Sequence, residues 1–112
     1  MKFKLHIEDQ YFNLIAQRKK TLEGRLNKVI RTFIAKGDII IFVNKQTNNQ
    51  IECEVTEIKH FKSIPEMVNG VDLNALGFEG QTKQDAIKVY QGFYNEQDVN
   101  RLGMVVLGIK RI

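Results

Sequence analysis

The chain has 112 residues, of which 43% are hydrophobic and 27% charged, with a single proline, and this balance predicts one globular domain over residues 1–112 rather than a disordered segment. Its one cysteine excludes an internal disulfide, and no apolar run approaches the roughly 20 residues of a membrane span. With a formal net charge of +4, we expect a soluble cytoplasmic domain, monomeric or weakly dimeric, with no membrane partner and no cofactor.

Alternating and helical patterns follow one another at the start of the chain. Apolar and polar residues alternate over residues 3–7, which predicts a half-buried strand. Helical spacing over residues 9–18 predicts a helix, and alternation returns over residues 21–26 as a second strand. The basic stretch 27–36 predicts a helical turn that carries Val29, Ile30 and Phe33.

The middle of the chain predicts a pair of strands. Ile39–Val43 is typical of a strand buried on both faces, and Asn48–Asn49 is typical of a turn before a strand from Ile51 to about Lys59. The apolar phase of that strand shifts between Val55 and Ile58, which predicts a bulge or sharp bend. Barrels use such bends to turn corners.

Capping patterns mark the helices of the second half. Ser63 and Thr82 predict the starts of a short and a longer helix, and Asn95 predicts the start of a final helical turn that ends at Gly103. Residues 104–109 close the chain as a strand. About five to six strands with interspersed helices predict an α+β fold with a small, bent β-barrel.

Most common catalytic chemistries lack the residues they need. His6, His60 and Cys53 have no metal-ligand spacing, and the chain has neither a phosphate-binding glycine loop nor a nucleophile elbow. Cys53 shares its strand face with apolar residues, which favours a buried and inert thiol. We therefore expect no metal site.

Positive charge is concentrated in one segment. Residues 18–36 hold seven cations and one carboxylate, Glu23. The cations are Arg18, Lys19, Lys20, Arg25, Lys28, Arg31 and Lys36. Such a flank attracts polyanions, of which nucleic acid is the commonest in a cytosol; the alternative is a solvated face that only promotes solubility.

The second predicted strand carries the side chains with the most chemical content. If its leucines face the core, Thr21, Glu23 and Arg25 share the opposite face, and Lys20 is long enough to reach the same place. A carboxylate, a guanidinium and an ammonium in that arrangement can bind a polar heterocycle. The alternative is a solvated strand face with a weak Glu23–Arg25 pair.

Aromatic residues near the end of the longer predicted helix allow two interpretations. Phe93 and Tyr94 could stack on a base. Their helical spacing with Tyr90 favours packing in the core instead.

Lys20–Arg25, which follows an amphipathic helix, and the later segment Lys36–Phe42 together resemble the ASCH family (activating signal cointegrator homology). Glu54–Thr56, Phe93–Tyr94 and the closing strand from Gly103 extend the resemblance over nearly the whole chain. The resemblance implies a PUA-like fold, a small bent barrel surrounded by helices. It also implies a cleft beside the barrel that binds RNA or nucleotides.

The resemblance assigns the family's Lys, Glu and Arg to Lys20, Glu23 and Arg25. We accordingly favour an RNA- or nucleotide-binding domain in which these residues hold the ligand. The nearby cations would contact phosphates or add to a basic rim: Lys19, Lys28, Arg31 and Arg18.

Two alternatives remain. One branch of the family removes acyl groups from N4-acylated cytidines with a Lys, a Thr three residues later and a more distant Glu. Here Glu23 occupies the position of that Thr, so the catalytic candidates would be Lys20, Thr21 and Glu23, with Arg25 as oxyanion stabiliser. The distant Glu would be Glu66 or Glu79. The second alternative is a protein-interaction domain.

Overall fold

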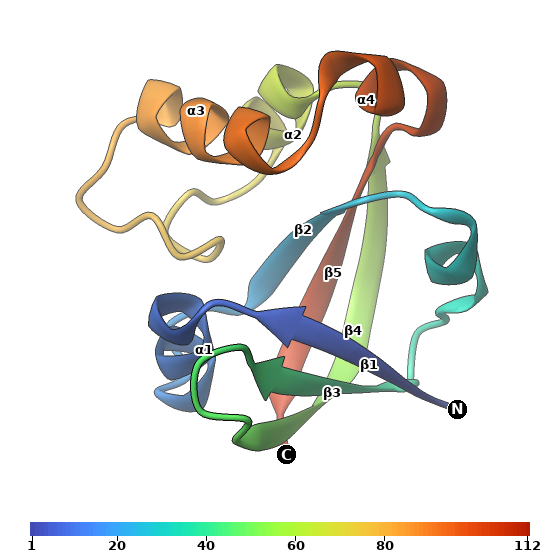
Figure 1. Ribbon diagram of the computed structural model, residues 1–112, viewed down its shortest axis with the longest axis vertical. Coiled ribbons are helices and arrows are strands. Elements are labelled where there is room, and N and C mark those ends of the chain that lie inside the picture. The colour runs from blue at the N-terminus through green and yellow to red at the C-terminus, as the bar shows by residue number, and fades with distance from the viewer.

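The computed structural model describes residues 1–112 and has an α+β fold built on one five-stranded sheet (Figure 1). The strands are β1 (Lys2–Ile7), β2 (Leu22–Leu26), β3 (Ile39–Asn44), β4 (Gln50–Phe61) and β5 (Met104–Arg111). The helices are α1 (Asp9–Ala16), α2 (Ile64–Gly70), α3 (Lys83–Phe93) and α4 (Glu96–Leu102), with a 3₁₀ turn, η1 (Val29–Phe33), after β2. The predicted α+β class is confirmed.

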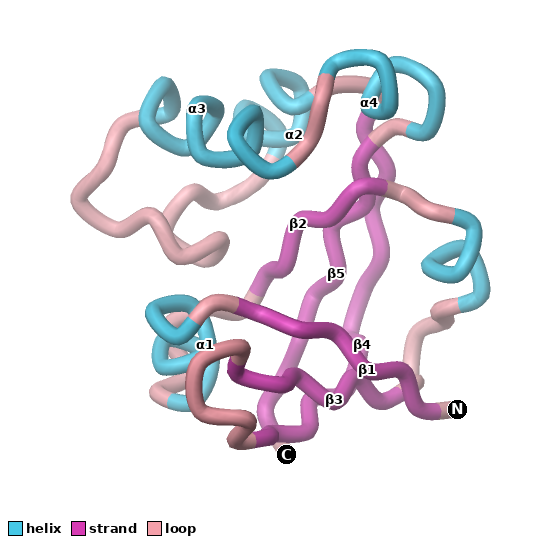
Figure 2. The backbone as a smooth tube through the Cα atoms, viewed as in Figure 1, coloured by secondary structure: helices cyan, strands magenta, loops and turns pink.

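The sheet is curled into a half-barrel with one open seam. Its strand order is β1-β3-β4-β5-β2, in which β1 runs parallel to β3 and the other neighbours are antiparallel. The predicted irregularity of β4 lies between Val55 and Glu57, where the register with β5 shifts. The edge strands β1 and β2 do not pair with each other, and the long strands β4 and β5 run from the end near α1 to the end near α2 and α4 (Figure 2).

Two apolar clusters fill the molecule on opposite sides of the sheet. The first lies around α1 and contains Phe12, Ile15 and Phe42, whereas the second lies around α2 and α3 and contains Met67 and Tyr90. Alternate residues of β5 enter the two clusters, because successive side chains of a strand point to opposite faces. Val105, Leu107 and Ile109 join the first cluster, and Met104 and Val106 join the second.

The predicted helix starts are confirmed by their hydrogen bonds. The side chains of Ser63, Thr82 and Asn95 accept from backbone N–H groups in the first turns of α2, α3 and α4. Thr82 and Asp85 form a complete capping box at α3. Gly103 ends α4 with a φ of 74°, a conformation that glycine adopts without steric cost.

The predicted turn is present as η1, but the three apolar side chains expected on it do not reach either cluster, whereas Ile34, directly after η1, joins the first. Val29, Ile30 and Phe33 are 70%, 60% and 66% exposed. Cys53 is fully buried as expected, and burial raises the pKa of its thiol to about 11. No helix has both the length and the apolar character needed to cross a membrane.

Candidate ligand-binding cavity

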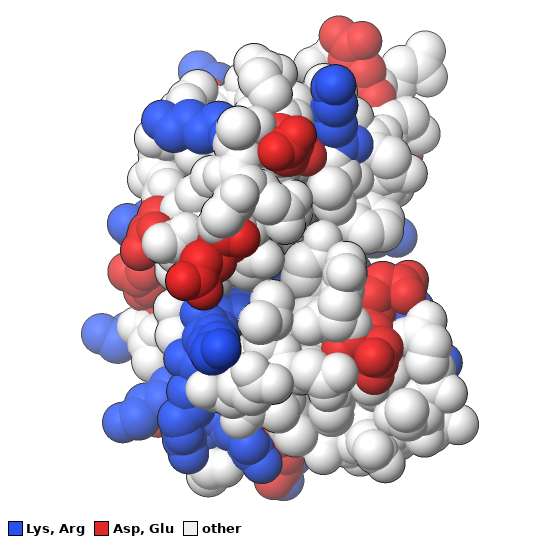
Figure 3. Space-filling view, turned by 90° about the vertical axis from the view of Figure 1, so that its left-hand side faces the viewer, with Lys and Arg blue, Asp and Glu red and all other residues white.

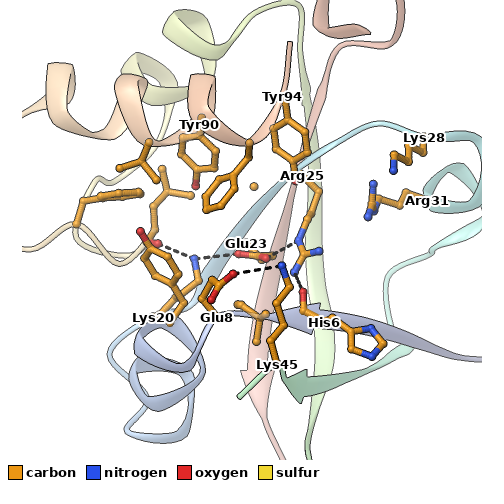
Figure 4. Close-up of a pocket in the computed structure, with 17 residues that line it drawn as sticks. His6, Glu8, Lys20, Glu23, Arg25, Lys28, Arg31, Lys45, Tyr90 and Tyr94 are labelled. Carbon is orange, nitrogen blue, oxygen red and sulfur yellow. Dashed lines mark hydrogen bonds and ion pairs between the residues drawn. The ribbon is translucent and has the colours of Figure 1, made fainter. Parts of the chain in front are cut away.

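A cavity of about 260 Å³ opens at the seam between β1 and β2, with α3 on its other side (Figure 4). Five cations and two carboxylates line it, so its charge is positive. The charged lining residues are Glu8, Lys20, Glu23, Arg25, Lys28, Arg31 and Lys45. On the α3 side it is lined by Val89, Tyr90, Phe93 and Tyr94.

Glu23 is held between two cations at the base of the cavity. One carboxylate oxygen lies 3.0 Å from Nζ of Lys20, and the other accepts from Nε of Arg25 at 2.6 Å. Lys20 is 3% exposed and Glu23 6% exposed, so the bulk solvent screens this contact weakly. A buried carboxylate with two cationic partners remains ionised.

The ammonium of Lys20 has all three of its donors occupied. Besides Glu23, it donates to the carbonyl oxygens of Leu22 at 2.7 Å and Leu76 at 2.5 Å. Burial lowers the pKa of Lys20, since desolvation outweighs the attraction of Glu23. The group therefore holds strand β2 and the 71–82 loop together and has no free proton or lone pair for a ligand.

Arg25 bridges the open seam of the half-barrel with its side chain. Besides its bond to Glu23, it donates from Nη2 to the carbonyl oxygen of His6 on β1 at 2.8 Å (Figure 4). Burial alone would lower the pKa of this guanidinium, but the charge of Glu23 reverses the shift and raises it. The same two cations overcome the effect of burial on Glu23 and lower the pKa of its carboxyl.

Gly24 presents free backbone groups to the cavity. The carbonyl of Thr21 accepts from Ile109, and Asn27 donates to the carbonyl of Gly103, so odd-numbered residues of this stretch bond with β5. The alternation of an antiparallel ladder then turns the N–H and C=O of Gly24 outward, toward the open seam. A side chain here would crowd the cavity wall, because an added Cβ would lie 3.0 Å from the hydroxyl oxygen of Tyr90.

Two further polar groups of the cavity lack a partner. The hydroxyl of Tyr90, a residue only 5% exposed, points toward the base of the cavity and makes no hydrogen bond (Figure 4). Arg31 donates from Nη1 to the carbonyl of Leu26 at 2.9 Å, while its Nε is buried and unpaired. Buried polar groups are nearly always satisfied, so the unpaired Nε of Arg31 is unusual. Together with the free hydroxyl of Tyr90 in the cavity wall, it indicates a place where a ligand would bind.

The structure brings five of the predicted site residues to the cavity and leaves three outside it. Lys20, Glu23, Arg25, Lys28 and Arg31 line the cavity. The residues outside are Arg18, Lys19 and Thr21.

Thr21 lies outside because it precedes β2 rather than belonging to it. Its N–H donates to the carbonyl of Ala75, and its side chain is exposed beside a different hollow of the surface. Glu66 and Glu79 are exposed and do not line the cavity. The cavity that Lys20 lines thus contains neither Thr21 nor a distant Glu.

Sequence reasoning missed several lining residues. Glu8, which lies beside Lys45 at 3.3 Å, forms the rim opposite α3. Phe93 was expected in the core, but it is 52% exposed at the cavity because it ends α3, beyond the last turn that packs on the sheet. Stacking on a base, the other interpretation of Phe93 from the sequence, fits this exposed position.

The curled half-barrel, with a charged cavity at its seam and helices around it, is a PUA-like arrangement. The chain belongs to the ASCH domain family, whose model matches residues 5–112. The resemblance stated from the sequence is thereby confirmed. No curated protein matches the chain.

Solved structures with the same fold include two proteins of this size. The crystal structure of hypothetical protein PH0355 is 30% identical with a TM-score of 0.90, and the match covers all of both chains. The solution structure of protein PF0455 from Pyrococcus furiosus is 27% identical with a TM-score of 0.74, over 100% of this chain and 98% of that one. An ASCH domain from Lactobacillus crispatus JV V101, at 12% identity, shares the fold with a TM-score of 0.70 over 98% of this chain and 79% of its own.

Proposed function

We propose that the cavity binds a nucleotide or the end of an RNA strand. The observation that carries the proposal is a positively charged cavity in which hydrogen-bonding groups of Gly24, Tyr90 and Arg31 have no partners and lie beside the exposed ring of Phe93. A base offers a planar face and a polar edge, and a phosphate offers charge. The cavity presents a matching group for each.

The roles divide between the two sides of the cavity. Phe93 and Tyr94, whose ring centroids lie 6.2 Å apart, offer faces on which a base can stack. Gly24 offers one donor and one acceptor to the edge of the base. Lys28 and Arg31 supply the positive charge for a phosphate. Glu23 and Lys20 act by holding β2 in place, because their polar atoms are already engaged with each other.

The hydrolase alternative is not proposed. Thr21 lies outside the cavity, and the Lys20 ammonium, with three acceptors, has no lone pair with which to take a proton from a nucleophile.

Titration of the labelled protein with cytidine monophosphate and with a short single-stranded RNA, followed by amide NMR, tests the binding proposal. We expect shifts at Gly24, Arg25 and Tyr90, with affinity falling as salt rises, since a phosphate contact on a single strand adds a slope of about −0.7 to log K against log salt. Arg31→Gln should weaken binding about tenfold and reduce that slope.

Lys59→Gln is the matched control, because it removes one exposed cation that does not line the cavity. Its affinity should stay within about twofold of the unmodified protein. Equal losses in Arg31→Gln and Lys59→Gln would mean that binding is a non-specific charge effect and would contradict the proposal, as would unshifted amides at the seam.

A further inference from the structure

A second basic hollow lies between the end of α1 and β5, away from the open seam. It is lined by charged and hydroxyl side chains: Arg18, Thr21, Thr56, Glu57, Lys110 and Arg111. Lys20 separates it from the cavity, because this residue lines both. Lys and Arg side chains gather on the lower part of the face that α1 occupies (Figure 3).

Arg18 and Arg111 are each held by a bond to a backbone carbonyl across the hollow. Nη1 of Arg18 donates to the carbonyl of Arg111 at 2.9 Å, and Nη1 of Arg111 donates to the carbonyl of Ala16 at 2.5 Å. Each guanidinium has five N–H donors and uses one of them here, so most of its donors remain free. Two guanidinium groups are thus fixed beside one hollow without neutralising each other.

Of the four cations that line this hollow, only Lys20 has a carboxylate partner, Glu23. Arg18, Lys110 and Arg111 make no ion pair, although the molecule forms six elsewhere. Glu57 lines the hollow and is exposed, but lies beyond ion-pair distance of all three. The hollow therefore keeps an excess of positive charge.

Arg18 occupies this position at a conformational cost. Its φ of 63° lies in the left-handed region that favours glycine, two residues after α1 ends at Ala16. The backbone is held there because the N–H groups of Lys19 and Lys20 both donate to the carbonyl of Leu14. The left-handed backbone of Arg18 therefore follows from the way α1 ends.

We propose that this hollow is a phosphate-binding site, separate from the seam cavity, in which Arg18, Lys110 and Arg111 supply charge and the hydroxyls of Thr21 and Thr56 donate hydrogen bonds. The site takes a tetrahedral phosphate group, either as a free phosphate or as a phosphate of an RNA strand. The proposal does not depend on what binds in the seam cavity.

Arg18→Gly gives an unusually clean test, because glycine suits the left-handed backbone. The variant removes the guanidinium while relieving the strain, so its melting temperature should equal or exceed that of the unmodified protein. Arg18→Ala also removes the guanidinium but keeps the backbone strain, so it should melt at a lower temperature than Arg18→Gly. Both should bind phosphate about fivefold more weakly.

The probe is inorganic phosphate, followed through the amide signals of Arg18, Thr56 and Arg111 at low ionic strength, with sodium chloride of equal ionic strength as the reference. Glu57→Gln should tighten phosphate binding about twofold, because it removes the opposing charge. Identical shifts with chloride, or unchanged phosphate binding in Arg18→Gly, would overturn the proposal.

Two further ligands distinguish the source of the phosphate. If Arg18→Gly weakens binding of a single-stranded RNA hexamer but not of cytidine monophosphate, the site takes a strand phosphate. If it weakens inorganic phosphate alone, the site takes a free phosphate. Failure of the seam proposal is visible separately, as unshifted amides at Gly24 and Arg25.

Discussion

The carboxylate of Glu23 connects three segments of the chain. It binds Lys20 directly, and through Lys20 it is linked to the carbonyl of Leu76, while Arg25 links it to His6 on β1. Lys20 and Glu23 are buried, and the Arg25 side chain is 13% exposed. Such a buried ion pair adds little to the free energy of unfolding. Removing one partner lowers that free energy strongly, because it leaves a buried charge uncompensated.

Glu23→Gln should therefore lower the free energy of unfolding by about 3–5 kcal/mol, as measured by urea denaturation. Glu8→Gln is the control, because Glu8 is a partly exposed rim carboxylate whose ion pair with Lys45 is accessible to solvent. We expect the control to lower the free energy of unfolding far less, because solvent screens this pair. A Glu23→Gln protein as stable as the control would show that the buried cations find other partners.

The same carboxylate makes stability depend on pH. Its pKa is lowered in the folded protein by Lys20 and Arg25, which outweigh burial, from an ordinary value of 4.5. A group whose folded pKa is depressed contributes stability that is complete above its unfolded pKa and is lost as the pH falls through the folded pKa. Below about pH 4.5, urea midpoints should therefore fall more steeply for the unmodified protein than for Glu23→Gln.

At the scale of the elements, α3 determines where the aromatic wall of the cavity stands. The helix carries Tyr90 and Phe93, and its first turn is fixed by the capping box of Thr82 and Asp85. The hydroxyl of Thr82 accepts from the N–H of Asp85 at 3.1 Å, and the carboxylate of Asp85 accepts from the N–H of Thr82 at 3.0 Å. The position of the wall thus depends on two hydrogen bonds about two turns away.

Thr82→Ala should destabilise the protein by about 1 kcal/mol, because it leaves a helix N–H group without an acceptor. Thr82→Ser keeps the hydroxyl and should recover most of the loss. Thermal unfolding followed by circular dichroism measures both. An alanine variant as stable as the serine variant would mean that water satisfies this helix end equally well.

Features set by neighbouring residues could be predicted from the sequence, whereas features set by packing could not. The capping residues and the bulge of β4 depend on local patterns, and each was found where predicted. The position of Thr21 depends on its hydrogen bond to Ala75, which lies 54 residues away in an irregular loop. Glu8 reaches the cavity only because the sheet curls, and the curvature of the sheet cannot be predicted from a local sequence pattern.

At the scale of the molecule, β5 joins the two apolar clusters. Its residues alternate between the two clusters from Met104 to Ile109. If β5 unfolds, both clusters therefore lose part of their packing at the same time. β5 also pairs with both β4 and β2. We therefore propose that residues 1–112 form a single folding unit.

Urea unfolding should accordingly show one transition. The chain has no tryptophan; Tyr90 and Tyr94 belong to or contact the second cluster, and Tyr11 contacts both clusters. Tyrosine fluorescence thus reports mainly on the second cluster, whereas circular dichroism reports on the whole backbone. We expect coincident midpoints from the two probes; separate midpoints would show that the clusters unfold independently.

The open seam also bears on how copies of this chain behave toward one another. An unpaired strand edge is a template on which a strand from another molecule can add, and Gly24 offers the backbone groups that such an addition would use. Arg25 crosses that edge to reach β1, and Lys20 and Glu23 place charge beside it. The residues that shape the cavity therefore also disfavour edge-to-edge aggregation. A variant that lacks them is expected to be less soluble as well as weaker in ligand binding.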